Sequence, residues 1–252
     1  KLLDRIYLQE KERHDSQYRE YKILNQDDDN LIKNYTVKVD ETRTDLIDEI
    51  ISIKNDLASM QDDKPLTGAA GLLYYTKHLY KPLFYINQKS VEYIRISPVA
   101  LNEGEEKFVR NLREYSRKHQ HLFADKSLYL LRNLSRGKGV NFFEANNFYP
   151  DFILWIISGD KQHIAFVDPK GIYNMSEGKN SPKIGLSKEI KNIQAQLNDD
   201  KVTLDSFILA GTRQQSILWA DNWGQNDFEE NNIYFDYDDN HIEKMINKIL
   251  GN

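Results

Sequence analysis

The spacing of apolar residues predicts a mainly helical N-terminal part. An apolar stripe at the start predicts a helix within residues 1–34, and alternation predicts a short strand over residues 35–39. After Thr44 or Asp45, either of which suits a helix N-cap, apolar residues at steps of four, three and four predict a second helix. These residues are Leu46, Ile50, Ile53 and Leu57. We expect residues 1–65 to form a helical connector whose second helix packs on a core rather than in a coiled coil.

Stronger patterns follow in the second part of the chain. Asn102 is placed to cap a helix, and a turn over residues 136–139 leads into a short strand. Further strands are expected over residues 94–97, 127–131, 151–157, 162–168, 202–209 and 233–235, and further helices over residues 186–197 and 242–250. This order predicts an α/β domain over residues 66–252, with its core at about 96–215 and a mixed central sheet flanked by helices.

One hairpin fixes the register of its two strands. Residues 158–161 read Ser-Gly-Asp-Lys, and glycine at the first central position suits a two-residue type II′ turn. Counting back from the turn places Asp151 opposite Asp168 as a non-hydrogen-bonded pair, with Cα atoms about 4.5 Å apart. Lys170 follows two residues later and projects from the same face. Three charged groups are therefore expected to converge.

Apolar residues occupy both faces of this hairpin, which is typical of strands inside a sheet that helices cover. The two aspartates then stand at the end of a buried platform, where their charges repel unless a proton, a lysine or a divalent cation lies between them. An oxygen-only site suits Mg²⁺ or Mn²⁺. Glu105 lies on the apolar face of the helix after Asn102, where a carboxylate needs a partner. A solvated salt bridge at a sheet edge is the alternative interpretation of the facing aspartates.

Composition and charge narrow the class of protein. The chain has 252 residues, a formal net charge of −5 and no cysteine, which excludes disulfides, cysteine metal sites and thiol nucleophiles and fits a reducing compartment. No apolar run approaches the roughly 20 residues of a membrane helix. Net negative charge argues weakly against a dedicated nucleic-acid binder. Basic residues nevertheless dominate a strip after Glu105 that faces either phosphates or solvent, and they are Lys107, Arg110, Arg113, Arg117, Lys118, Lys126, Arg132, Arg136 and Lys138.

Two short motifs resemble the signature of the PD-(D/E)XK nuclease superfamily. They are Tyr149-Pro-Asp151 and, after an intervening segment, Asp168-Pro-Lys170. Longer runs look like the C-terminal nuclease domain of type III restriction-like DEAD/DEAH helicase–nucleases, and these are Asn102–Val109, Phe142–Glu144, Asn147–Ile153 and Phe166–Gly171. The likeness covers about residues 66–252 and implies a restriction-endonuclease-like core. Residues 1–65 look like the connector that follows the motor domains in such proteins.

The resemblance implies a role for each matching residue. Asp151 and Asp168 would ligate Mg²⁺ or Mn²⁺ with the Pro169 carbonyl, and Glu105 would complete the site or hold a second ion. Lys170 would orient or deprotonate the attacking water. Expected DNA contacts are Arg136, Lys138 and Gly171. The implied activity is an endonuclease that leaves a 5′-phosphate and a 3′-hydroxyl.

Partners and location follow from the same resemblance. The implied partners are DNA, a helicase or translocase domain outside this segment, and a modification or defence-system subunit. The implied location is the prokaryotic cytoplasm, with no membrane partner. The chain begins at Lys1 and lacks a GxxxxGK(S/T) phosphate-binding loop, so we expect any ATP motor elsewhere in a longer protein. Two alternatives stay open: a catalytically silent nuclease-like module that positions a motor on DNA, and a protein–protein adaptor built on the helix that spans residues 46–57 and on the acidic end of the chain.

Overall fold

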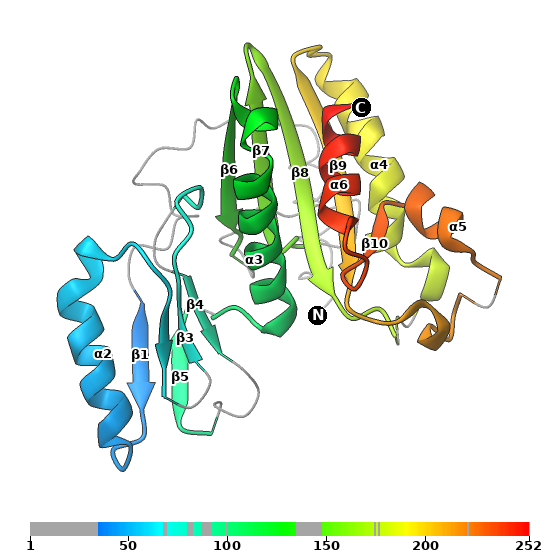
Figure 1. Cartoon of the computed structure of the whole chain (residues 1–252). Coiled ribbons are helices and arrows are strands. Elements are labelled where there is room, and N and C mark those ends of the chain that lie inside the picture. The colour runs from blue at the N-terminus through cyan, green and yellow to red at the C-terminus, as the bar shows by residue number, and fades with distance from the viewer. Residues whose placement is uncertain are drawn as a thin grey trace, which may run out of the picture.

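A five-stranded mixed sheet forms the centre of the second part of the chain (Figure 1). The computed structural model describes residues 35–67, 70–79, 83–86, 92–98, 100–134, 148–173, 175, 177–220 and 222–251. The helix expected within residues 1–34, the turn at 136–139 and the strand after it lie outside the described residues. The other expected elements are present.

The strands of the central sheet lie in the order β10-β9-β8-β7-β6. Their bounds are β6 Lys126–Arg132, β7 Phe152–Ser158, β8 Lys161–Lys170, β9 Val202–Ala210 and β10 Ile233–Phe235. β6, β7 and β8 are antiparallel neighbours, whereas β8, β9 and β10 pair in parallel. A parallel connection requires a crossover, and the helix between β8 and β9 provides it. The predicted mixed sheet is confirmed.

Helices cover both faces of this sheet. Helices α3 (Glu103–Lys118) and α6 (His241–Leu250) lie over one face, and α4 (Pro182–Leu197) packs against β9 on the other (Figure 1). The short α5 (Gln225–Glu230) packs beside β10. None of the described helices has both the length and the apolar character needed to cross a membrane.

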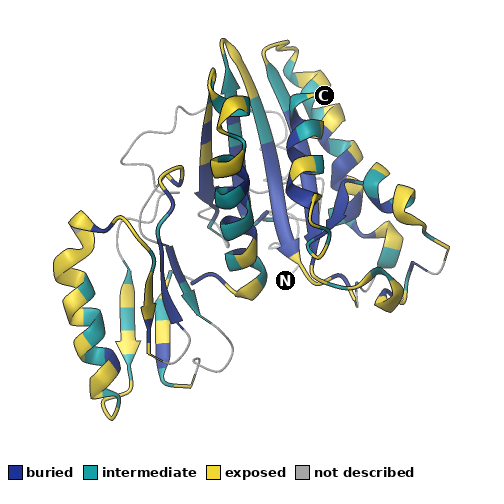
Figure 2. Ribbon diagram, viewed as in Figure 1, coloured by how far each residue is buried: buried dark blue, intermediate teal, exposed yellow. Residues whose placement is uncertain are grey.

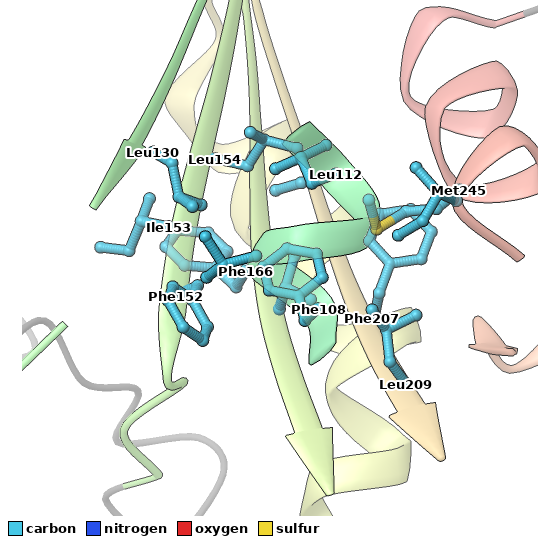
Figure 3. Packing of buried hydrophobic residues seen from close by; sticks show 14 of the residues in the cluster. Phe108, Leu112, Leu130, Phe152, Ile153, Leu154, Phe166, Phe207, Leu209 and Met245 are labelled. Carbon is cyan, nitrogen blue, oxygen red and sulfur yellow. The ribbon is translucent and has the colours of Figure 1, made fainter. Parts of the chain in front are cut away.

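Burial is deepest in the middle strands (Figure 2). Phe152, Ile153 and Leu154 of β7 are successive residues that alternate between the faces, yet each is at most 2% exposed. The hairpin is therefore covered on both sides, as its two apolar faces predict. Figure 3 shows Phe108 of α3 and Met245 of α6 meeting side chains of β7 and β9 in this core.

The predicted hairpin register is confirmed. Ser158 pairs with Lys161 and Phe152 with Val167. The two residue numbers of every pair between these limits add up to the same value, so the register does not shift along the hairpin. Gly159 has φ of 60°, as the first central residue of a type II′ turn requires. Extending the ladder by one position sets Asp151 opposite Asp168.

Two helix starts show how local chemistry sets the elements. The Asn102 side chain accepts a hydrogen bond from the Glu105 N–H at 3.0 Å, and the Glu105 carboxylate accepts one from the Asn102 N–H at 3.1 Å. This capping box confirms the expected start of α3. The cap expected at Thr44 or Asp45 is wrong, because α2 (Thr44–Asp56) follows Arg43 as its N-cap and Asp45 instead accepts a 2.9 Å hydrogen bond from the Arg43 guanidinium.

The N-terminal part contains more strand than predicted. β1 (Thr36–Val39) pairs with β5 (Ile94–Ser97), and β2 (Lys64–Leu66), β3 (Ala70–Leu73) and β4 (Leu83–Ile86) form a second small antiparallel sheet. With α2 they enclose a separate core. The predicted boundary after residue 65 falls inside β2 and lies between the paired strands β1 and β5. Strands β1 and β5 were predicted, whereas β2, β3 and β4 were not, because their three or four residues show no apolar–polar alternation.

Phe152 tests the core. We expect Phe152→Ala to lower the free energy of unfolding by about 3–5 kcal/mol in urea denaturation, because a fully buried ring leaves a cavity between β7 and α3. Tyr129, 41% exposed on the neighbouring β6, is the matched aromatic control, and Tyr129→Ala should cost less than about 1 kcal/mol. Equal losses in the two variants would contradict the described packing.

Candidate active site

A cleft of about 650 Å³ opens where β7 begins, β8 ends and α3 starts. Its lining carries most of the site residues that the sequence predicts. They are Glu105, Asp151, Asp168, Pro169, Lys170 and Gly171, joined by Lys183 of α4. Arg136 and Lys138 lie outside the described residues.

Asp168 is, with Glu105, one of two almost fully buried charged residues of the cleft. It is 4% exposed, and its Oδ2 atom has no hydrogen-bond partner among the described residues. The Nζ atom of Lys183 lies 3.6 Å from this oxygen. Burying a carboxylate oxygen without a hydrogen-bond partner costs folding free energy. A cation bound at Asp168 would offset that cost.

The buried position of Asp168 changes the pKa of its carboxyl group. Burial, followed by the charge of Asp151 and a hydrogen bond with it, raises the pKa of Asp168 from 3.8 to about 7. The ammonium groups of Lys183 and Lys170 act in the opposite direction but are too weak to cancel the burial. The predicted convergence of Asp151, Asp168 and Lys170 is therefore present.

Glu105 is buried as predicted but is already satisfied. Its Oε1 atom accepts a 2.8 Å hydrogen bond from Arg132 Nη2, and its Oε2 atom accepts the capping hydrogen bond from the Asn102 N–H. Burial raises the pKa of Glu105, and the charge of Arg132 opposes that rise. No group of three or more His, Cys, Asp or Glu side chains in the described ranges is arranged to hold a metal ion. The structure thus brings together the two aspartates but does not add Glu105 to them as a third ligand.

The sequence interpretation missed Lys183, which lines the cleft, and Arg132, which is buried against two of the lining residues, Glu105 and Asp151. Arg132 was placed in a surface strip, whereas it is 9% exposed and lies between Glu105 and Asp151. Its alternation with Leu128 and Leu130 on one face of β6 was the available signal. Lys183 was missed because the helix was expected from residue 186, although Pro182 is a favoured first helical residue.

The basic strip is largely neutralised. Arg110 and Arg113 both pair with Asp63, and Arg117 and Lys118 both pair with Glu114. The remaining described pairs of these residues are Lys107 with Asp236, Arg110 with Glu106, Lys126 with Asp125, and Arg132 with Glu105 and Asp151. A phosphate-facing strip along α3 is therefore a weaker interpretation than a salt-bridged helix face.

The end of β8 shapes the floor of the cleft. Pro169 is buried, and a Cβ added to Gly104 of α3 would lie 3.7 Å from its carbonyl oxygen, so this carbonyl faces the start of α3. Lys170 is exposed at the rim. A Cβ at Gly171 would meet only Thr212 Oγ1, at the ordinary contact distance of 3.6 Å, so close packing does not require glycine there.

No protein-family model, curated protein or solved structure matches this chain. The functional conclusion therefore depends on the geometry and chemistry of the cleft, together with the motif resemblance in the sequence.

Asp168 predicts how stability depends on pH in the metal-free chain. A carboxyl group with a higher pKa in the folded than in the unfolded state destabilises the fold as pH rises from about 4 to about 7. We expect the wild type in EDTA to lose about 3 kcal/mol more than Asp168→Asn between pH 5 and pH 8 in urea denaturation.

The control is Asp160→Asn, which changes an aspartate in the β7–β8 turn whose side chain is 71% exposed. Its pH dependence should follow that of the wild type. An Asp168→Asn variant with the wild-type pH dependence would show that Asp168 titrates normally.

Proposed function

We propose that this chain is a divalent-metal-dependent endonuclease domain with a restriction-endonuclease-like core that hydrolyses DNA phosphodiester bonds. One observation carries the proposal: Asp151 and Asp168 face each other at the buried end of a hairpin, Asp168 Oδ2 has no hydrogen-bond partner in the described chain, and Lys170 follows on the same face. Carboxylates in this order, followed by a lysine, also form the motif that the sequence resembles.

The donors of the cleft fit a hard cation. Asp151 and Asp168 supply carboxylate oxygens, and the Pro169 carbonyl is the third protein oxygen that would hold Mg²⁺ or Mn²⁺. When bound, the ion would neutralise phosphate charge and lower the pKa of a water molecule. A cation would also remove the repulsion that now raises the pKa of Asp168.

The remaining charged groups suit phosphate chemistry. Lys170, at the exposed rim, would hold the attacking water and stabilise the negative charge that develops on phosphorus-bound oxygen. Lys183 lies 4.3 Å from the centre of the Phe148 ring and beside Asp168, which orients its ammonium group toward the cleft. The first turn of α3 also lines the cleft.

The biological setting comes from the motif resemblance. It supports a longer restriction or antiviral defence protein in the prokaryotic cytoplasm, in which a helicase or translocase domain delivers DNA to this cleft. A modification or defence-system subunit is the further partner that the resemblance implies.

Plasmid cleavage tests the proposal. Supercoiled DNA should be nicked or linearised with Mg²⁺ or Mn²⁺ and left intact in EDTA, and Asp168→Ala or Lys170→Ala should lower the rate at least about 100-fold. Lys161→Ala removes an exposed lysine from the other end of β8 and should cut at the wild-type rate. Cleavage that survives both cleft substitutions would refute the assignment.

One observation favours the silent nuclease-like module instead. Glu105 is held by Arg132 and by its own capping box, so the third carboxylate is committed to structure. Calorimetric titration with Mn²⁺ separates the two functions, because a nuclease site should release metal-linked heat that Asp151→Asn abolishes. Absence of such heat in the wild type would favour the silent module.

A further inference from the structure

We infer that the Arg132 guanidinium occupies the place of a second cation, so that the cleft takes one divalent metal ion per chain. The inference rests on the proposed metal site and specifies how many ions that site holds. It makes Arg132 a positioning residue, because it acts through Glu105 and Asp151.

Arg132 bridges the two carboxylates that flank the cleft on its inner side. Nη2 lies 2.8 Å from Glu105 Oε1, and Nη1 lies 2.8 Å from the Asp151 carbonyl oxygen and 3.4 Å from Asp151 Oδ1. A planar guanidinium can donate to both partners from adjacent nitrogens, which an ammonium cannot do in the same geometry. The arrangement resembles that of an ion bridging two carboxylates.

The surroundings hold this guanidinium in place. The guanidinium carbon lies 5.3 Å from the centre of the Phe152 ring. The backbone N–H of Arg132 donates to His78 Nε2 at 2.8 Å, which fixes the strand end that carries the side chain. Next along β6, Asn133 donates to the carbonyls of Asp151 and Pro150 at 2.8 and 2.9 Å. The same strand end therefore fixes both Arg132 and the backbone on which Asp151 stands.

The charges and the metal-ligating oxygens of the cleft therefore suit one ion rather than two. Both oxygens of Glu105 already accept a hydrogen bond, and the Arg132 guanidinium already compensates its charge, so Glu105 attracts a second metal ion only weakly. Arginine stays protonated at all working pH values, and a second dication beside it would be repelled at short range. On the other side of Asp151, Asp168 Oδ2 has no hydrogen-bond partner in the described part of the chain, and its ion pair with Lys183 Nζ is long, at 3.6 Å.

His78 connects this arrangement to the N-terminal part of the chain. It lies in the segment after β3, and it forms a parallel bridge with Leu130 that covers the outer edge of β6. His78 is 4% exposed, so this contact is part of the fold rather than a surface encounter. The N-terminal strands therefore support the residue that we assign as the fixed cation.

Calorimetric titration of the full chain with Mn²⁺ tests the inference by stoichiometry. We expect one ion in the wild type and one in Arg132→Lys, which keeps the positive charge. Arg132→Gln should bind two ions, because Glu105 Oε1 and Asp151 Oδ1 lose their shared cation. Arg132→Gln combined with Glu105→Gln should return to one. Arg113→Gln is the matched control, since Arg113 pairs with Asp63 and lines a different cleft, and it should bind one ion.

Each result has a distinct consequence. Two ions in the wild type would overturn the inference and leave the metal-dependent nuclease intact, whereas no ion would overturn both. An unchanged single ion in Arg132→Gln would show that Arg132 does not exclude a second one. If circular dichroism shows that Arg132→Gln does not fold, the number of Mn²⁺ ions bound by the wild type and by Arg132→Lys tests the inference instead. Two ions in either protein would overturn it.

Discussion

The carboxylate of Asp168 is the constraint on which the rest of the cleft depends. It ends a strand that is buried on both faces, and one of its oxygens has no hydrogen bond within the described chain. A free buried charge is costly, and the opposite aspartate adds repulsion. Lys183 reduces this cost only in part, at 3.6 Å. The described groups compensate the charge of this buried carboxylate only in part, and the proposed metal site rests on this property.

Three features of the fold build this site. A glycine turn sets the register of β7 and β8 and so brings Asp151 opposite Asp168. A capping box starts α3 at the cleft and buries Glu105. The end of β6 places Arg132 between Glu105 and Asp151. Rigid elements meet at one edge, so the charged groups are held before any ligand arrives.

Much of this was predictable from the sequence, and the failures share a physical cause. Periodicity and turn chemistry gave the central strands, the register and the burial of Glu105, because each depends on residues close together in the chain. The partner of Glu105 was not predictable, since Arg132 comes from a strand whose position depends on the whole sheet. The same holds for Asp63, which neutralises Arg110 and Arg113 from a distant loop. Strands were predicted at residues 36–39 and 94–97, but their pairing was not, because it joins segments that are far apart in the chain.

The most direct test of the account is a crystal structure of the chain with Mn²⁺, with anomalous scattering measured at the manganese absorption edge. The account predicts one anomalous peak between Asp151 and Asp168, within about 2.0–2.4 Å of a carboxylate oxygen from each and near the Pro169 carbonyl. Arg132 should stay on Glu105. A cleft without a peak at saturating Mn²⁺, or a peak bound away from Asp168, would contradict the claim that this buried carboxylate is a metal ligand.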